Sequence, residues 1–187
     1  KLNRTVALKT LPRIDPVALQ RFKQESRALA GVNHPNLVTL YELISDGETW
    51  FFSMELIEGV GFLQYVRSGI GDGQPGAHAA AAGGALSPLQ LIRLRRGLTQ
   101  LVAAVAALHK AGVLHRDIKP SNILVTAEER LVLLDVGLAA ELGGAEAYLS
   151  SDGGLVGTVA YMSPEQGSVD AVTQASDWYS VGAVLYE

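Results

Sequence analysis

The chain has 187 residues, a net charge of −4, 48% hydrophobic and 18% charged residues, and no cysteine. This composition is typical of a soluble globular domain and unlike that of a disordered chain. The small negative charge excludes a strongly basic surface for nucleic acid, and the lack of cysteine excludes disulfides and thiolate metal sites.

The first predicted element is a strand over residues 5–11. Its side chains alternate, with Val6 and Leu8 on one face and Ala7 and Lys9 on the other. Because Ala7 is small, the face that it shares with Lys9 leaves room for a flat ligand beside the ammonium group.

A helix is predicted over residues 15–30, between a capping aspartate followed by proline and a terminal glycine. Glu25 falls on the same side of this helix as the apolar residues, where a carboxylate needs a partner. We expect an ion pair between Lys9 and Glu25, the alternative being two solvated charges. Two strands follow over 37–43 and 50–56, joined by a polar turn.

The second part of the chain is predicted to be rich in helix. Residues 68–87 are mostly glycine and alanine, which we interpret as a flexible insertion. A long helix is predicted over 88–110, because leucine and valine recur there at spacings of three and four, and Gly112 ends it. Residues 123–125 and 131–134 predict a short hairpin. No apolar run is long enough to span a membrane, which takes about 20 residues.

The segment "VLHRDIKPSNILV" (113–125) concentrates polar groups between two apolar flanks. Asn122 and Asp135, which ends the next strand, offer hard oxygen ligands of the kind that Mg²⁺ prefers. Asp117 would then orient a hydroxyl and accept its proton, and Lys119 would neutralise a transferring phosphoryl group. The alternative is a polar loop with one or two capping interactions, which is hard to reconcile with all these residues at these spacings.

At these residues the chain resembles the catalytic domain of eukaryotic-like (Hanks-type) serine/threonine protein kinases in their bacterial form. The resemblance spans nearly the whole chain apart from residues 68–87. It is carried by five segments, which resemble in turn the third-strand lysine motif, the hinge, the catalytic loop, the end of the activation segment and helix F: "VALK" (6–9), "SMELIEG" (53–59), "HRDIKPSN" (115–122), "GTVAYMSPEQ" (157–166) and "SDWYSVGAVLYE" (176–187).

The resemblance implies an α+β, two-lobed protein-kinase-like fold that is truncated at both ends. Residues 1–56 would form part of a small antiparallel-sheet lobe with helix C. Residues 57–187 would form part of a mainly helical lobe, running from the hinge exit to helix F. The chain starts at the third strand without a glycine-rich loop and stops at helix F, so we expect the fragment alone not to be a competent enzyme.

The implied substrate pair is ATP and a protein hydroxyl, with Mg²⁺ or, in its place, Mn²⁺. Asp117, Lys119 and Asn122 would be catalytic, and Asn122 and Asp135 would hold the metal. Asp177 would brace the catalytic loop from below. Among the residues that would bind the nucleotide, Met54 would be the gatekeeper, and the main chain of Glu55 and Ile57 in the hinge would contact the adenine. The full set is Lys9, Glu25, Ala7, Met54, Glu55, Ile57, Leu124 and Asp135.

The resemblance also implies an acceptor class and a mode of regulation. Lys119, two residues after Asp117, and Thr158 are typical of kinases that modify serine or threonine. Arg116 is typical of kinases switched by a phosphate on the activation segment, for which Ser150, Ser151 and Thr158 are the candidates; the alternative is that these are ordinary loop residues. We expect a cytoplasmic kinase domain, activated in some cases by dimerisation, with membrane anchoring elsewhere in a parent chain left open.

One departure from the family pattern favours a second hypothesis. Val136 stands where the family usually has phenylalanine, and the smaller side chain leaves a cavity unless its neighbours collapse. A pseudokinase or nucleotide-binding scaffold that regulates a partner is therefore the alternative to an active kinase. A small-molecule kinase is disfavoured by residues 157–165, which resemble a peptide-docking element.

Overall fold

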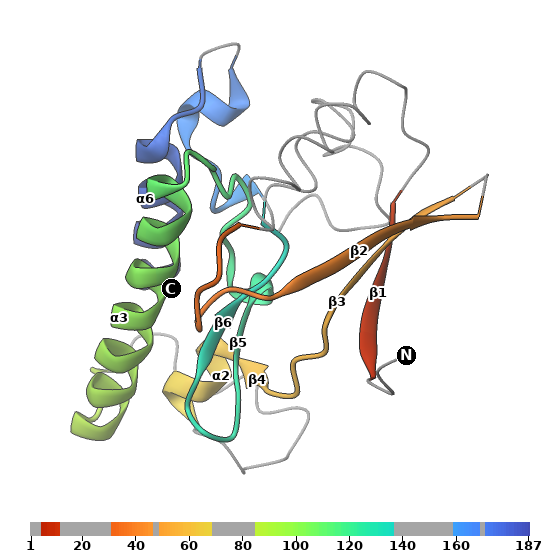
Figure 1. Ribbon diagram of the computed structural model, residues 1–187. Coiled ribbons are helices and arrows are strands. Elements are labelled where there is room, and N and C mark those ends of the chain that lie inside the picture. Colours follow the sequence, from red (N-terminus) through yellow and green to blue (C-terminus); the bar gives the residue numbers. More distant parts are fainter. Residues whose placement is uncertain (1–4, 12–30, 47–48, 69–84, 137–158, 169–170) are drawn as a thin grey trace.

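The computed structural model describes residues 5–11, 31–46, 49–68, 85–136, 159–168 and 171–187. The helix predicted over 15–30 and nearly all of the predicted insertion lie outside these residues. Figure 1 shows a sheet on one side of the molecule and two long helices on the other, with a short hairpin between them. The division of the chain into lobes at residue 56 stays a prediction.

The first sheet contains three antiparallel strands, β1 (Val6–Leu11), β2 (Leu40–Ser45) and β3 (Trp50–Glu55), in the order β1-β3-β2. The strand predicted over 5–11 and its alternation are confirmed. Leu8 is 63% exposed, whereas Ala7 on the opposite face packs against the cluster of buried residues that includes Phe52 and Met54. This alternation turns Lys9, which shares the face of Ala7, towards the interior of the molecule.

The strand predicted over 37–43 is wrong at its start, because β2 begins only at Leu40. The preceding residues pair instead with the second sheet: Leu37 forms a parallel bridge with Leu133, and the amide of Val38 donates to the carbonyl of Leu133 at 3.1 Å. The apolar pattern of the segment shows that it is buried, but it cannot show that its first residues pair with one sheet and its later residues with another. The strands predicted over 50–56 and 131–134 each end one residue early, at Glu55 and Leu133.

The second sheet is formed by β4 (Val60–Gly61), β5 (Ile123–Val125) and β6 (Leu131–Leu133), all antiparallel. The predicted hairpin is thus confirmed as β5 and β6. A short helix, α2 (Phe62–Arg67), follows β4 directly.

The predicted long helix is confirmed as α3 (Pro88–Lys110). It starts with a capping box in which Ser87 and Gln90 satisfy each other's backbone amides. It ends before Gly112, whose φ of 76° is a conformation that glycine adopts without strain.

The main core lies between α3, the hairpin and the last helix, α6 (Gln174–Tyr186). The predicted apolar stripe of α3 is buried here, with Leu101, Val105 and Leu108 inaccessible to solvent. Val181 of α6 packs into the same cluster, so the two helices lie side by side, as Figure 1 shows. This packing fixes both ends of the loop that joins α3 to β5. None of the helices that the structure describes is both long and apolar enough to cross a bilayer.

Candidate functional site

The loop between α3 and β5 is held from below by Asp177, which is only 1% exposed. Its Oδ2 accepts the backbone N–H of His115 at 2.8 Å, and its Oδ1 accepts the N–H of Arg116 at the same distance. His109, near the end of α3, contacts Oδ2 through Nε2, also at 2.8 Å. The bracing position expected for Asp177 therefore agrees with the geometry.

The imidazole of His115 joins this loop to the end of β6. Its Nδ1 accepts the backbone N–H of Asp117 at 3.2 Å, and its Nε2 lies 2.8 Å from the carbonyl oxygen of Leu134. Burial lowers the pKa of His115, an effect that the neighbouring carboxylate of Asp177 opposes. The neutral ring, with its proton on Nε2, satisfies both contacts.

Asp117 is the centre of a group of polar side chains on the loop. Its Oδ2 lies 2.9 Å from Nζ of Lys119 and accepts Nδ2 of Asn122, also at 2.9 Å. The same Nδ2 donates to the carbonyl of Asp117 at 2.8 Å. Asn122 closes the 3₁₀ turn η1 (Pro120–Asn122) and is buried. These contacts engage Oδ2 of Asp117 and Nδ2 of Asn122, so the Oδ1 atoms of both side chains can face a ligand.

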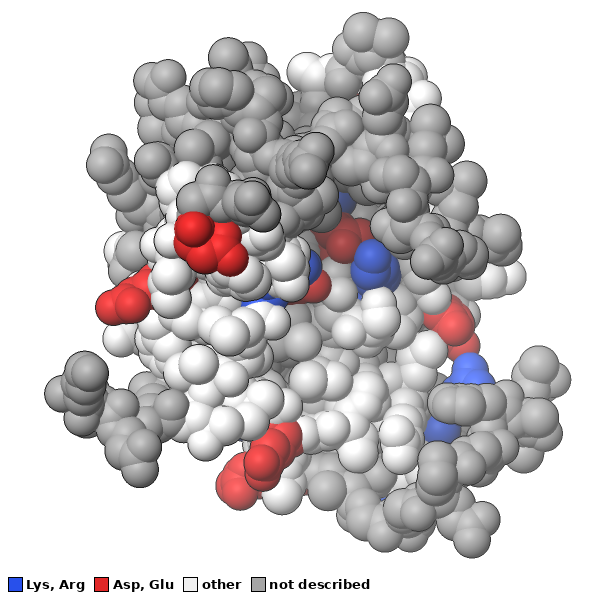
Figure 2. Space-filling model, turned by 90° about the vertical axis from the view of Figure 1, so that its right-hand side faces the viewer, with Lys and Arg blue, Asp and Glu red and all other residues white. Residues whose placement is uncertain are grey.

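The structure brings Asp135 and Lys9 together from different sheets. Nζ of Lys9 on β1 lies 2.8 Å from Oδ2 of Asp135, which follows β6. The backbone amide of Leu134 donates to the carbonyl of Asn122 at 2.8 Å, which places Asp135 next to the loop between α3 and β5. The φ of Asp135 is 58°, a left-handed conformation that aspartate tolerates better than most residues. In Figure 2, acidic and basic groups lie next to one another on the face that carries β1.

The side chains predicted to surround an adenine are partly brought together. Ala7, Met54 and Ile57 belong to or pack against one apolar cluster, together with Val132. Leu124 lies in β5, where it pairs with Gly61 of β4 and with Val132, a member of that cluster. Ala7 lies two positions before Lys9 in β1, so the cluster forms an apolar surface next to the strand that carries the ammonium group.

The side chain of Glu55 has a role that the sequence did not indicate. It forms a two-point ion pair with Arg130, with N–O distances of 2.8 and 3.2 Å, and it accepts the hydroxyl of Thr39 at 3.2 Å. Nε of Arg130 also donates to the carbonyl of Pro35 at 2.6 Å. The hydrogen bond from Arg130 lowers the pKa of Glu55. The end of β3 is therefore tied to the hairpin and to the segment before β2.

Four predicted residues lie outside the described part of the chain, namely Glu25, Ser150, Ser151 and Thr158. The ion pair between Lys9 and Glu25 and the regulatory phosphorylation sites therefore stay predictions. Arg116, the remaining regulatory residue, is described and adopts a φ of 66°.

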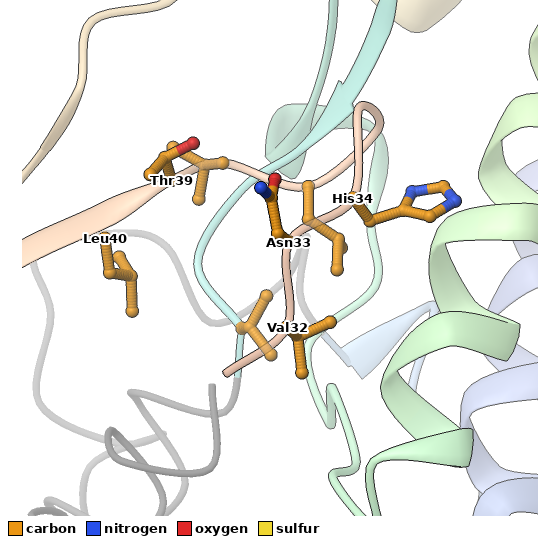
Figure 3. A pocket seen from close by; sticks show the side chains of 8 residues that line it. Val32, Asn33, His34, Thr39 and Leu40 are labelled. Carbon is orange, nitrogen blue, oxygen red and sulfur yellow. The ribbon is translucent and has the colours of Figure 1, made fainter. Parts of the chain in front are cut away.

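A cavity of about 280 Å³ lies beside the segment that leads into β2 (Figure 3). It is lined by Val136 and residues before and within β2: Val32, Asn33, His34, Leu37, Val38, Thr39 and Leu40. His34 turns its ring away from the cavity, towards α3. The cavity thus adjoins Val136, where a side chain smaller than phenylalanine is expected to leave space, and its lining includes neither Lys9 nor Asp117.

Sequence reasoning also missed a contact made by Gln166. This residue ends a capping box with Ser163 around the short turn η2 (Pro164–Gly167), in which its Oε1 accepts the N–H of Ser163 at 3.1 Å. Its Nε2 donates to the carbonyl of Arg116 at 2.7 Å. The spacing Ser-x-x-Gln signals the capping box, but no local pattern could identify the distant carbonyl.

The whole chain, residues 1–187, matches the sequence profile of the family described as "Protein kinase domain". It is 31% identical over 189 residues to serine/threonine-protein kinase PrkC of Bacillus subtilis, of which it covers 26%. It is 37% identical over 190 residues to serine/threonine-protein kinase PknL of Mycobacterium tuberculosis, of which it covers 43%. It is 34% identical over 194 residues to the probable serine/threonine-protein kinase PknB of Bifidobacterium longum, of which it covers 26%. In each case the match includes the entire chain, which spans less than half the length of these relatives.

Proposed function

This chain belongs to the protein kinase family in its bacterial Hanks-type form, and we propose that it is the core of an ATP-dependent enzyme that phosphorylates serine or threonine hydroxyls of proteins. The expected α+β, kinase-like fold class agrees with this membership. One observation carries the proposal: the Lys9–Asp135 pair lies beside the loop on which Asp117 contacts both Lys119 and Asn122. Such a set of charges suits the transfer of a phosphoryl group.

The nucleotide is proposed to lie against the first sheet. The apolar cluster that Ala7, Met54 and Ile57 share supports an adenine position next to the end of β3, with Leu124 and the main chain of Glu55 completing it. Lys9 would hold the phosphates, since it follows Ala7 on the same face of β1 and its ammonium lies 2.8 Å from Asp135. Glu25 would orient Lys9 in that state.

The oxygen donors of the site fit a divalent metal ion. A carboxylate from Asp135 and the carboxamide oxygen of Asn122 are hard ligands, and Mg²⁺ usually takes few protein ligands and completes its shell with water and phosphate. The ammonium of Lys9, 2.8 Å from Asp135, supports the view that this carboxylate attracts a cation. When bound, Mg²⁺ or Mn²⁺ would offset the negative charge of the phosphates.

Asp117 is proposed as the group that orients the acceptor hydroxyl and takes its proton. Its Oδ2 is fixed by Asn122 and Lys119, so Oδ1 can face the hydroxyl without rearrangement. Lys119, held 2.9 Å from Asp117, would then stabilise the charge of the moving phosphoryl group.

We further propose that the domain acts in the cytoplasm and is regulated through its activation segment. Arg116 would pair with a phosphate on Ser150, Ser151 or Thr158, in some cases after two copies of the domain meet.

The test uses the full-length protein with radiolabelled ATP and a generic serine/threonine substrate. Asp117→Asn should lower phosphate transfer by about 10²–10⁴-fold, because the proton acceptor is lost, and leave nucleotide binding nearly unchanged. Lys9→Met should abolish autophosphorylation by loosening the grip on the phosphates.

Undiminished transfer in the Asp117→Asn variant would refute the assignment. Nucleotide binding without transfer in the unaltered protein would instead indicate the regulatory scaffold that Val136 suggested.

A further inference from the structure

Arg116 is held in an unfavourable backbone conformation just before the proposed catalytic aspartate. Its φ of 66° lies in the left-handed region, which a residue with a long side chain seldom occupies. Such a conformation persists only where the surrounding structure specifies it. The contacts of the Arg116 main chain therefore decide how the loop presents Asp117.

Two side chains from different elements hold this main chain from opposite ends. Asp177, at the start of α6, accepts the N–H of Arg116 at 2.8 Å. Gln166, in η2, donates Nε2 to its carbonyl oxygen at 2.7 Å. Asp177 was anticipated as a brace, whereas the contact of Gln166 was not.

The carbonyl held by Gln166 belongs to the peptide group that joins Arg116 to Asp117. A peptide group is planar, so fixing its oxygen and its N–H fixes the orientation of the whole plane. The N–H of this group, that of Asp117, is held by Nδ1 of His115 at 3.2 Å. The plane, and with it the direction in which the Asp117 side chain leaves the backbone, is therefore set jointly by Gln166 and His115.

The amide of Gln166 divides its two functions between its two polar atoms. Oε1 accepts the N–H and the hydroxyl of Ser163, at 3.1 and 3.2 Å, and thereby closes the capping box of η2. Nε2 alone reaches Arg116. A substitution that keeps an acceptor but removes the donor can therefore separate the cap from the contact with the loop.

We propose that Gln166 is a positioning residue for catalysis, which orients Asp117 through the carbonyl of Arg116 and so couples the segment around η2 to the catalytic loop. This inference rests on the proposed function, because the group being oriented is the proposed proton acceptor.

The decisive variant is Gln166→Glu in the full-length protein. The carboxylate retains the acceptor for Ser163 and lacks the donor for Arg116. We expect kcat for phosphate transfer to fall by about 10- to 100-fold, because a small misplacement of a reacting group is costly. KM for ATP should change by less than about twofold, since the nucleotide contacts are untouched. Gln166→Met, which is neutral and makes no such hydrogen bond, should show the same fall in kcat.

The matched control is Ser163→Ala, which removes the hydroxyl of the capping box and leaves the donor of Gln166 in place. Its kcat should stay close to that of the unaltered protein. Equal losses in Ser163→Ala and Gln166→Glu would show that only the cap matters and would overturn the proposal, as would an unchanged kcat in both Gln166 variants.

Hydrogen exchange of the peptide covering residues 113–119, measured by mass spectrometry, provides a readout that does not depend on activity. Exchange should be faster in both Gln166 variants and unchanged in Ser163→Ala, and unchanged exchange in the Gln166 variants would overturn the coupling. If the unaltered protein binds ATP but transfers no phosphate while the exchange pattern holds, the proposed function fails and the contact between Gln166 and the loop stands.

Discussion

The two sides of the proposed site are built very differently. On the loop side, the backbone around His115 and Arg116 is fixed by side chains that are almost fully buried, with His115 and Asp177 at 0% and 1% exposure. On the strand side, Lys9 projects from an edge strand, its side chain is 34% exposed, and its described ion pair is with Asp135.

If the proposed function holds, the loop side would be a fixed reaction centre and the strand side an adjustable contact with the nucleotide. Buried hydrogen bonds are costly to break, because their partners are left without water. A partly exposed ion pair contributes little to stability and can exchange partners easily. Under the proposed function, Lys9 would leave Asp135 for phosphate oxygens, and we expect the loop to keep its geometry when the nucleotide binds.

The largest expected effect comes from removing the brace on the loop side. Asp177→Ala would leave the N–H groups of His115 and Arg116, and the ring of His109, without their acceptor. We expect the free energy of unfolding to fall by about 3–5 kcal/mol, with loss of activity in parallel. Urea denaturation followed by fluorescence measures the loss. A decrease below about 1 kcal/mol would contradict the view that the loop side is rigidly held.

The second effect concerns the cavity beside Val136. Val136→Phe adds a ring next to a space of about 280 Å³, so the ring should be accommodated. We expect the free energy of unfolding to rise by about 0.5–2 kcal/mol, as cavity-filling substitutions often give. Thermal unfolding of the two proteins under the same conditions is the measurement. A drop in melting temperature would mean that the cavity does not extend in the direction of the ring.

A third prediction tests the strand side directly. Lys9→Met should change the free energy of unfolding by only about 0.2–1 kcal/mol, because the pair with Asp135 is partly exposed. The same variant is expected to lose phosphate transfer. Urea denaturation and the transfer assay, carried out on one preparation, compare the two losses. A stability loss as large as that of Asp177→Ala would remove the distinction between the two sides.

The smallest effect is a pH dependence at the end of β3. The pKa of Glu55 is lowered from 4.5 by its hydrogen bond with Arg130, so the folded protein binds a proton there less readily than the unfolded chain. The resulting stability is present above pH 4.5 and is lost as the pH falls through the folded pKa. Denaturation midpoints measured from pH 6 down to pH 3 should therefore decline less steeply in Arg130→Met. Identical slopes would show that the ion pair does not contribute.

Much of the fold followed from periodicity and local signals. The spacing of Leu101, Val105 and Leu108 predicted α3 and its buried face, because a helix repeats every 3.6 residues. The alternation around Lys9 predicted β1 and the face that Lys9 shares with Ala7, and the structure showed that this face turns inward. The start of β2 was missed because Leu37, although apolar and buried, pairs with Leu133 of the second sheet and not with a strand of the first sheet. Sequence patterns report that a residue is buried and do not identify its partner.

The sequence by itself determined most of the elements, though not β4 or α2, together with the membership of the family and the residue types of the site. Each of these depends on local spacing: helical and strand periods, and the order of charged residues within the loop around Asp117. Only the tertiary structure decided which groups meet, including Lys9 with Asp135, Glu55 with Arg130, and Gln166 with the carbonyl of Arg116. These partners lie between 50 and 126 positions apart in the sequence, and contacts over such distances are set by packing of the core rather than by any local preference of the chain.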